Sequence, residues 1–226
     1  MPEPPIRDAA TVILLRDRDG PQVLMGRRAA TAVFMPSKSV FPGGAVDPGD
    51  AAVPLAGLPD PVCMERLAEA AAPGLARALV AAAIRETWEE TGLILGPPGA
   101  WPQPPPDWAG LAAAGRVPSG AGLRFVFRAL TPPGRPRRFD ARFFLADADA
   151  LGVAGEDFAR ASGELADLRW IPLEAVRDFD LPFVTELVLA ELAQMLRRGA
   201  QAAGVPFFTG EDGETGFRRL GRPLRG

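Results

Sequence analysis

Apolar and polar positions divide the chain into short strands and longer helices. Two β-rich apolar runs, at residues 10–15 and 22–26, flank the turn sequence Arg-Asp-Arg-Asp-Gly and predict a β-hairpin. A short extended piece at 39–41 ends at a Pro-Gly-Gly turn, because proline and glycine interrupt a strand. Further strands are predicted at residues 123–130, 141–146 and 165–171.

Four segments carry the apolar repeat of helices. The clearest follows the breaker Pro73-Gly74, runs from about residue 75 to Thr91 and ends at Gly92. The other helices are predicted at residues 62–72, 173–178 and 182–198. Near the C-terminus, the sequence around Gly-Glu-Asp-Gly-Glu predicts a small hairpin. Strands and helices in mixed order indicate an α+β sandwich with a mixed central sheet.

The chain has 226 residues, of which 47% are hydrophobic, enough for one sizeable core. We therefore expect residues 1–226 to form a single domain. Three segments elaborate this domain: an insertion at about 51–74, a Pro- and Gly-rich loop or lid at about 96–120, and a C-terminal tail at about 200–226.

The composition restricts the chemistry that the chain can perform. Histidine is absent, which excludes Ser-His and Cys-His nucleophilic catalysis and any histidine zinc site. Tyrosine is absent as well, and Cys63 is the only cysteine, so no intramolecular disulfide can form. Any reaction must depend on carboxylates, arginine, hydroxyls or a bound metal.

Charge and hydropathy also limit the partners. The net charge is −3 and the pI is near 5.2, so the chain lacks the basic field typical of nucleic-acid binding. The N-terminal apolar run is too short for a signal peptide, and no stretch approaches the length of a membrane span. We expect a soluble, cytoplasmic protein with no nucleic-acid or membrane partner, and a homodimer is one assembly that the sequence allows.

Three glutamates crowd the end of the helix predicted at 75–91. At about 100° per residue, Glu86, Glu89 and Glu90 fall within an arc of roughly 100°. They repel one another, and the negative end of the helix dipole disfavours them further. Such a cluster is often a solvated helix face. The alternative is a bound divalent cation, and hard oxygen ligands of this kind suit Mg²⁺ or Mn²⁺.

The same segment resembles the Nudix signature, Gx5Ex7REUxEExGU, in which U is a bulky aliphatic residue. The stretch from Arg85 to Leu93 matches its second half, with Thr87 at the first U position. Upstream, Phe-Pro-Gly-Gly ending at Gly44 matches the usual lead-in, and Asp50 stands where the family usually has Glu. The spacer from 51 to 84 has 34 residues, where the consensus has seven, so 27 are inserted. This split box is similar to the branch that includes coenzyme A diphosphatases.

The resemblance implies a Nudix-type α/β/α sandwich with an insertion within the Nudix box, and it implies a set of metal ligands. In this family the three glutamates of the second half ligate metal, and so does the carbonyl of the first glycine of the lead-in. A further acid often lies six residues before a tryptophan that opens a strand. The implied ligands are Gly43, Glu86, Glu89, Glu90 and Glu164, although Glu164 is as easily an ordinary loop glutamate.

The catalytic roles stay partly open at this stage. Metal ions neutralise the charge of a diphosphate and lower the pKa of bound water, and a carboxylate then takes the proton. Glu86, Glu90 and Glu164 are all candidates for that base. Arg85 is expected to orient Glu89 or a neighbouring carboxylate, or to form only a surface ion pair.

Recognition of the rest of the substrate is less specified. Arg27 and Arg28 precede the Phe-Pro-Gly-Gly lead-in, where coenzyme A-active relatives carry an arginine-containing motif, and Arg142 belongs to a basic stretch beside a strand. Each could bind phosphate, or each could be a solvated surface arginine. Trp101 and Trp108 could stack on a nucleobase, but such residues are more often loop anchors packed on the core.

These features favour a small-molecule, nucleotide-derived substrate. The leading hypothesis is hydrolysis of a diphosphate linkage in a nucleoside diphosphate derivative, in particular coenzyme A or an acyl-CoA. Alternatives are an ADP-ribose, NADH or dinucleoside polyphosphate pyrophosphatase, a Nudix-like module that binds nucleotide without turnover, and a structural protein whose acidic helix is coincidental. The insertion between Asp50 and Arg85 predicts a pocket wall or lid.

Overall fold

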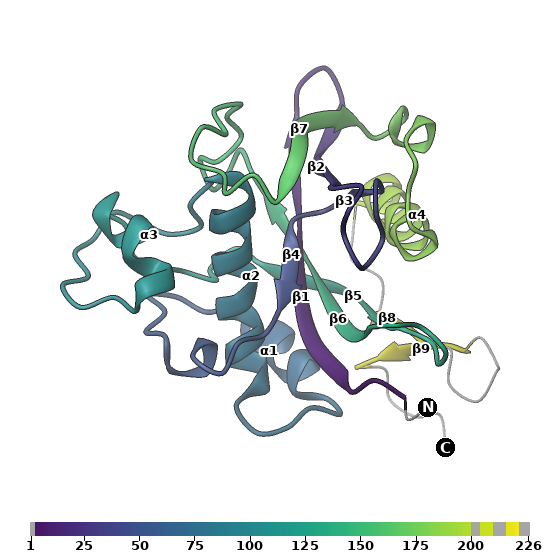
Figure 1. The fold of residues 1–226 in the computed structure, drawn as a ribbon, viewed down its shortest axis with the longest axis horizontal. Coiled ribbons are helices and arrows are strands. Elements are labelled where there is room, and N and C mark those ends of the chain that lie inside the picture. The colour runs from purple at the N-terminus through teal and green to yellow at the C-terminus, as the bar shows by residue number, and fades with distance from the viewer. Residues whose placement is uncertain (1–2, 200–203, 210–215, 222–226) are drawn as a thin grey trace.

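The computed structural model describes residues 3–199, 204–209 and 216–221. Within these residues, nine strands form one mixed sheet in the order β3-β2-β1-β6-β5-β8-β9, with β4 paired to β1 and β7 paired to β2 (Figure 1). The β1–β6 and β5–β8 pairs are parallel, and the other pairs are antiparallel. The strands are β1 (Ile6–Asp17), β2 (Pro21–Arg28), β3 (Ser39–Val40), β4 (Gly43–Ala45), β5 (Arg124–Leu130), β6 (Arg138–Asp147), β7 (Leu165–Pro172), β8 (Val205–Thr209) and β9 (Gly216–Leu220).

Helices cover both faces of this sheet. Figure 1 shows α2 on one side of the strands and α4 on the other. Side chains along β1 alternate accordingly: Val12 and Leu14 belong to the core cluster that contains α2, whereas Ile13 belongs to the cluster that contains α4. The expected α/β/α sandwich is confirmed. The helices are α1 (Pro61–Ala68), α2 (Leu75–Thr91), α3 (Ala109–Ala113) and α4 (Phe183–Arg198), with short 3₁₀ turns η1 (Asp50–Ala52), η2 (Pro106–Trp108) and η3 (Val176–Asp178).

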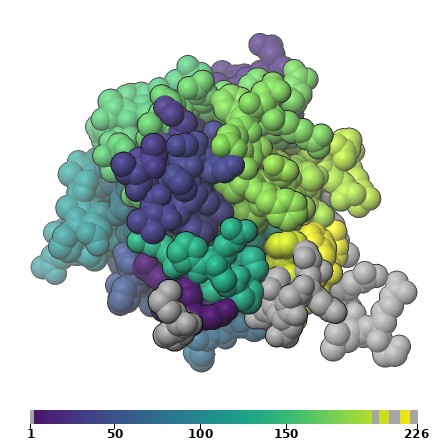
Figure 2. All heavy atoms as spheres, turned by 45° about the vertical axis from the view of Figure 1, so that its right-hand side comes forward, coloured from purple at the N-terminus to yellow at the C-terminus, as the bar shows by residue number. Residues whose placement is uncertain are grey.

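The face that carries α4 is closed by side chains. In the space-filling view, α4 and the segment between β2 and β3 lie next to each other over the strands (Figure 2). The helix contributes Val188, Leu189 and Leu192 to the core on this side. None of the helices among the described residues is long and apolar enough to cross a membrane.

The helix predicted from the clearest pattern has the bounds that the sequence gives it. α2 begins after Gly74 (φ 80°) and ends before Gly92 (φ 73°), and both glycines adopt the left-handed conformation that terminates helices easily. The predicted first hairpin is confirmed as β1–β2, with β1 extending further at both ends. The C-terminal hairpin is confirmed as β8–β9, while its Gly-Glu-Asp-Gly-Glu sequence lies outside the described residues.

Other boundaries differ from the prediction. The helix predicted to reach residue 72 ends at Ala68, because Glu69 is extended and Ala70 has a φ of 52°. The segment 173–178 forms only the 3₁₀ turn η3, and the Pro-rich segment contains η2 and α3, which the sequence did not predict. β4 was also missed, because Gly-Gly-Ala has the composition of a turn rather than of a strand.

The insertion within the signature is part of the core. Cys63 and Leu67 of α1 are buried in the same apolar cluster as α2, and α1 lies against both α2 and β5. An N-cap bond from Cys63 N to the Asp60 carboxylate (3.0 Å) starts this helix. α1 is therefore a structural element of the sandwich, and a pocket wall or lid formed by the insertion stays a prediction.

Candidate active site

Arg85 is the centre of the carboxylate network at the end of α2. Its side chain is buried, and its guanidinium pairs with both oxygens of Asp50, at 3.1 Å from Nε and 3.1 Å from Nη2. Nη2 also donates to the carbonyl of Ala45 (2.9 Å). Nη1 donates to Glu86 (2.8 Å) and lies 3.4 Å from Glu89. Because Arg85 is buried, the alternative of a surface ion pair is wrong, and its bonds to Glu86 and Glu89 are those that the expected orienting role requires.

Asp50, which stands at the first acid of the signature in sequence, is buried against Arg85. It is 2% exposed and accepts a further bond from the backbone N–H of Asp47 (2.8 Å). Although 34 residues separate it from Arg85 along the chain, the two side chains meet directly. The inserted residues are thus looped out without displacing the acid from its arginine.

The glycine turn brings the backbone against the glutamates. Gly43 N donates to the Glu90 carboxylate (2.7 Å), and both glycines belong to β4, which pairs with β1. A Cβ on Gly43 would lie 2.5 Å from the carbonyl oxygen of Ala10, and one on Gly44 would lie 2.4 Å from the carboxylate of Glu86. Gly43 therefore requires glycine, because the near atoms are backbone, whereas a side chain at position 44 would displace the Glu86 carboxylate. The glycines and the helix thus form one site.

Burial makes this site electrostatically unusual. Burial is the largest cause that raises the pKa of Glu90 to about 8, and the negative charges of Glu86 and Glu164 raise it further, against the Gly43 N–H bond. Burial likewise raises the pKa of Glu86 to about 7, although Arg85 opposes the shift. The pKa of Glu89 is raised for the same first reason. The alternative of a solvated helix face is wrong for Glu86 and Glu90.

Two residues from other elements join this group. Glu164, just before β7, is close enough for its charge to act on both Glu86 and Glu90. Arg28, at the end of β2, lies 3.7 Å from the Glu164 carboxylate and lowers the pKa of Glu90. The Arg28 Nε is buried and has no hydrogen-bond partner among the residues that the structure describes.

Solved structures identify the fold and the family. A Nudix hydrolase from Alicyclobacillus acidocaldarius is 33% identical to this chain, with a TM-score of 0.65 over 84% of this chain and 92% of that one. The chain belongs to the Nudix hydrolase family. A MutT protein from Methanosarcina mazei Go1 shares the fold at 16% identity, with a TM-score of 0.51 over 87% of this chain and 99% of that one. No protein-family model and no curated protein matches the chain.

Membership makes this protein a hydrolase of pyrophosphate bonds in nucleoside diphosphate derivatives. Nudix enzymes generally use divalent metal ions. The donors of this site are carboxylate oxygens, which hard divalent cations prefer. Like charges held in a buried site are destabilised without a compensating cation. The residues therefore fit a divalent cation in chemistry and in charge.

The glutamates of this Nudix site are nevertheless held by protein groups. Across the described part of the chain, no group of three acidic side chains is arranged so that it could hold a metal ion. Arg85 binds Glu86 and Glu89, and the Gly43 N–H binds Glu90, so each carboxylate has a partner that directs it. A metal would compete with these partners for the same oxygens.

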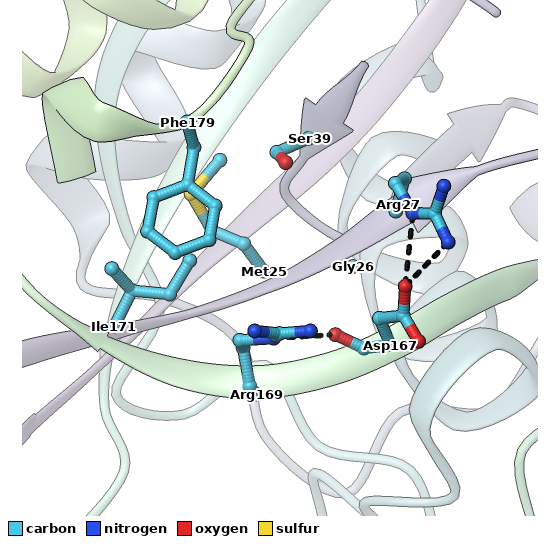
Figure 3. Close-up of a pocket in the computed structure, with 8 residues that line it drawn as sticks. All are labelled: Met25, Gly26, Arg27, Ser39, Asp167, Arg169, Ile171 and Phe179. Carbon is cyan, nitrogen blue, oxygen red and sulfur yellow. Dashed lines mark hydrogen bonds and ion pairs between the residues drawn. The ribbon is translucent and has the colours of Figure 1, made fainter. Parts of the chain in front are cut away.

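Two arginines that the sequence put forward for substrate binding lie elsewhere in this Nudix fold. Arg27 binds Asp167 and lines a pocket together with Met25, Phe179 and others (Figure 3). The volume of this pocket is about 100 Å³. Arg142 is 1% exposed and donates to Asp8 and to the carbonyl of Asp140. The structure brings Arg28 to the glutamates, but not these two, and the surface alternative for Arg142 is wrong.

The Pro-rich segment contributes an acid that sequence reasoning missed. The charges of Asp107, in η2, and of Asp47 raise the pKa of Glu89, so both lie near the outer glutamate of the site. Asp107 is placed by its neighbour Trp108, which is buried and packs on Trp101 at 5.8 Å between ring centroids. The two tryptophans anchor the loop on the core. This was one of the two roles that the sequence allowed, the other being stacking on a nucleobase.

Proposed function

We propose that this Nudix hydrolase cleaves the diphosphate linkage of coenzyme A or an acyl-CoA, with Mg²⁺ or Mn²⁺ at the glutamate site. The observation that carries the metal site is that the buried Glu90 and the mostly buried Glu86 both lie against Gly43 and Gly44. The split signature supports the coenzyme A branch, because its resemblance to coenzyme A diphosphatases includes the long spacer before Arg85.

The proposed ligands are the side chains of Glu86, Glu89 and Glu90 with the carbonyl of Gly43. When bound, a divalent cation neutralises charge on the diphosphate and makes a bound water more acidic. Arg85 fixes the directions of Glu86 and Glu89 through its own pairing with Asp50. This buried pairing limits the freedom of the helix end and so preorganises the ligands before substrate arrives.

Glu164 is the proposed general base. Its side chain is 60% exposed, so it can release a proton to solvent after each turnover, whereas Glu90 is almost completely buried. In the reaction, the water oxygen bonds to one phosphorus as the bridging P–O bond breaks. The proton of the water passes to the carboxylate, and the departing phosphate keeps the bridging oxygen with its electron pair.

Arg28 is the proposed phosphate-binding residue. Its Nε–H lacks an acceptor within the described structure, and an anionic phosphate oxygen would supply one. Its ion-pair partner Glu164 is 3.7 Å away, a separation that leaves room for a third group to compete. Binding of phosphate by Arg28 would also weaken the ion pair between Arg28 and Glu164. Glu164 must be released from this pair to accept a proton as the base.

A substrate panel tests this function. The purified protein would be incubated with coenzyme A, acetyl-CoA, ADP-ribose, NADH and a dinucleoside tetraphosphate, each with Mg²⁺ and with Mn²⁺, and the products identified by mass. The expected result is 3′,5′-ADP and a 4′-phosphopantetheine derivative as paired products. Faster cleavage of ADP-ribose or NADH would overturn the coenzyme A assignment. Binding of all compounds without turnover would favour a nucleotide-binding module.

A further inference from the structure

The segment of residues 148–163, between β6 and β7, leads to Glu164 and is tied to the sheet and to α2. At its start, Ala148 N donates to the carbonyl of Leu15 near the end of β1 (2.7 Å). Near its end, Ser162 N donates to the carbonyl of Glu89 at the end of α2 (2.7 Å). The segment thus connects β1 with the helix that carries the glutamates.

Gly92 lets the end of the segment lie directly on α2. A Cβ on Gly92 would be 2.9 Å from the Cβ of Arg160 and 3.2 Å from the backbone nitrogen of Ala161. Beyond this crossing, the hydroxyl of Ser162 accepts a bond from the backbone N–H of Glu164 (3.3 Å). Ser162 therefore bonds both to the carbonyl of a signature glutamate and to the backbone of the proposed base.

The middle of the segment is held by Arg16 of β1. The guanidinium donates to the carbonyl of Ala154 (3.0 Å) and to the carboxylate of Glu156 (2.8 Å). A third bond runs from its Nε to the side chain of Gln22 (2.9 Å). Arg16 is only 9% exposed, so water competes little for these bonds.

Trp170 of β7 holds the same part of the segment as Arg16. The Arg16 guanidinium carbon lies 4.5 Å from the centre of its ring, and the indole Nε1 donates to the carbonyl of Gly155 (2.8 Å). Arg16 and Trp170 together therefore bind three consecutive residues, 154 to 156. A stacked guanidinium with several fixed acceptors has little freedom to turn.

We infer that Arg16, stacked on Trp170, is a positioning residue that sets the place of Glu164 through the segment 148–163. This inference rests on the proposed role of Glu164 as the base. The bonds of Arg16 go to Gln22, Ala154 and Glu156, and not to Glu86, Glu89, Glu90 or Glu164. Arg16 holds the middle of the segment, and the bond from Ser162 to Glu89 holds its end on α2. Together these bonds keep the Glu164 carboxylate in one position relative to Glu86 and Glu90.

A double-mutant cycle tests the coupling. Arg16→Met keeps the apolar stem but removes the guanidinium, and Glu164→Gln removes the base. We expect Arg16→Met to lower kcat on the order of 10- to 100-fold, the range usual for partners of active-site groups, with KM changed much less. In the Glu164→Gln background the same change should lower kcat no further. Independent, multiplying effects would overturn the inference.

Hydrogen exchange supplies a readout that needs no substrate. In Arg16→Met, the amides of residues 153–163 should exchange faster, whereas those of α2 should keep their protection. Unchanged exchange in the segment would overturn the inference, and so would faster exchange throughout α2, which would indicate a general structural role. Arg7→Met, an exposed arginine on the same strand, is the matched control and should change neither quantity.

Trp170→Phe is the second variant in case Arg16→Met folds poorly. Phenylalanine keeps an aromatic surface under the guanidinium but loses the bond to Gly155. It should give a smaller effect in the same direction, again absent in the Glu164→Gln background, and full additivity would overturn the inference. If Glu164→Gln retains the wild-type rate while Glu90→Gln does not, the inference fails and the proposed function stands. If Glu90→Gln also retains it, the proposed function fails.

Discussion

At the scale of single residues, the site is defined by carboxylates in a buried environment that disfavours their ionised form. Burial makes ionisation of both Glu86 and Glu90 more difficult. The charge of Glu86 adds to this effect at Glu90, and the charges of Glu89 and Glu164 add to it at Glu86. Arg85 offsets part of this repulsion for Glu86, whereas a backbone N–H from Gly43 is the bond that the structure gives Glu90. Burial of a carboxylate destabilises its ionised form, so the presence of two such groups in one site is more easily explained by function than by a contribution to stability.

Glu90→Gln should therefore separate activity from stability. Glutamine has nearly the same shape, and its amide oxygen can still accept from the Gly43 N–H, while the negative charge is lost. Loss of a residue that only supports a metal ligand typically lowers activity by about 10- to 100-fold. Glu90 is proposed as a direct ligand, so we expect kcat to fall by more than about 100-fold. The melting temperature of the metal-free protein at pH 8 should rise or stay equal. Glu65→Gln, an exposed glutamate of α1, should change neither. Near-normal turnover in Glu90→Gln would place the site elsewhere.

The same pKa shifts predict how stability depends on pH without metal. The pKa of Glu86 is about 7 and that of Glu90 about 8 in the folded protein, above the ordinary value of 4.5. A raised pKa means that the folded state holds the proton more tightly, so this stabilisation is complete below about pH 4.5 and is lost as the pH rises through 7 to 8. Thermal unfolding in a chelator should show the loss in wild type, and a smaller loss in Glu90→Gln.

Adding Mn²⁺ should reverse that loss, because the cation binds the ionised carboxylates. The increase in melting temperature should therefore be larger at pH 8 than at pH 5.5. An equal increase at both values would indicate binding at groups other than these glutamates. The difference between wild type and Glu90→Gln removes the contribution of all other titrating residues.

At the scale of elements, the site depends on how closely β4 approaches α2. The Gly-Gly-Ala strand brings its backbone onto the Glu86 carboxylate, and the pairing with β1 keeps it there. The chain forms this strand through backbone pairing alone, since glycine has little preference for the extended state. Close approach rather than propensity is what the two glycines provide.

Gly44→Ala tests this approach. The new methyl would lie 2.4 Å from the Glu86 carboxylate, so the carboxylate must move. Because only the flexible end of Glu86 has to move, we expect a stability loss at or below the lower end of the about 1–3 kcal/mol of overpacked sites, together with weaker Mn²⁺ binding measured by calorimetry. Gly49→Ala is the matched control, because no atom lies within 4 Å of its added Cβ and its φ is −77°. If Gly44→Ala bound Mn²⁺ as tightly as Gly49→Ala, Glu86 would not be a ligand in the form proposed.

Sequence patterns predicted α2 and the site on it because both are local. The apolar repeat, the flanking glycines and the three glutamates all lie within 20 residues of the chain. Arg28 was identified only as one of several arginines. Glu164 was identified singly, from its spacing to Trp170 in the family resemblance, with an ordinary loop glutamate as the alternative. Arg27 and Arg28 are neighbours in sequence, yet only Arg28 joins the glutamates, because adjacent residues of a strand point to opposite faces. The approach of Asp107 to Glu89 depends on how a Pro-rich segment folds back, which no local pattern encodes.

At the scale of the whole molecule, the insertion is integrated by buried charge as well as by apolar contact. Arg128 of β5 is 5% exposed and binds both oxygens of Asp140, at 2.8 and 2.6 Å. Its Nη1 also donates to the carbonyl of Glu69 at the end of α1 (3.2 Å), and its guanidinium lies over Phe207 of β8. The Arg128 side chain therefore joins the insertion, the central sheet and the C-terminal hairpin. These contacts of Arg128 do not include Glu86, Glu89 or Glu90.

Arg128→Met should accordingly affect stability without affecting chemistry. Removing one partner of a buried ion pair costs about 3–5 kcal/mol, and the lower end is expected here because Arg142 remains 3.3 Å from the same Asp140 carboxylate. Urea unfolding would measure the loss, and kcat would be compared at a temperature at which the variant is folded. Arg124→Met, exposed on the same strand, is the control and should leave both quantities unchanged. Since Arg128 touches α1 and not the carboxylate end of α2, a fall in kcat of the folded variant would show that the insertion acts on the active site, which would contradict its assignment as a structural element.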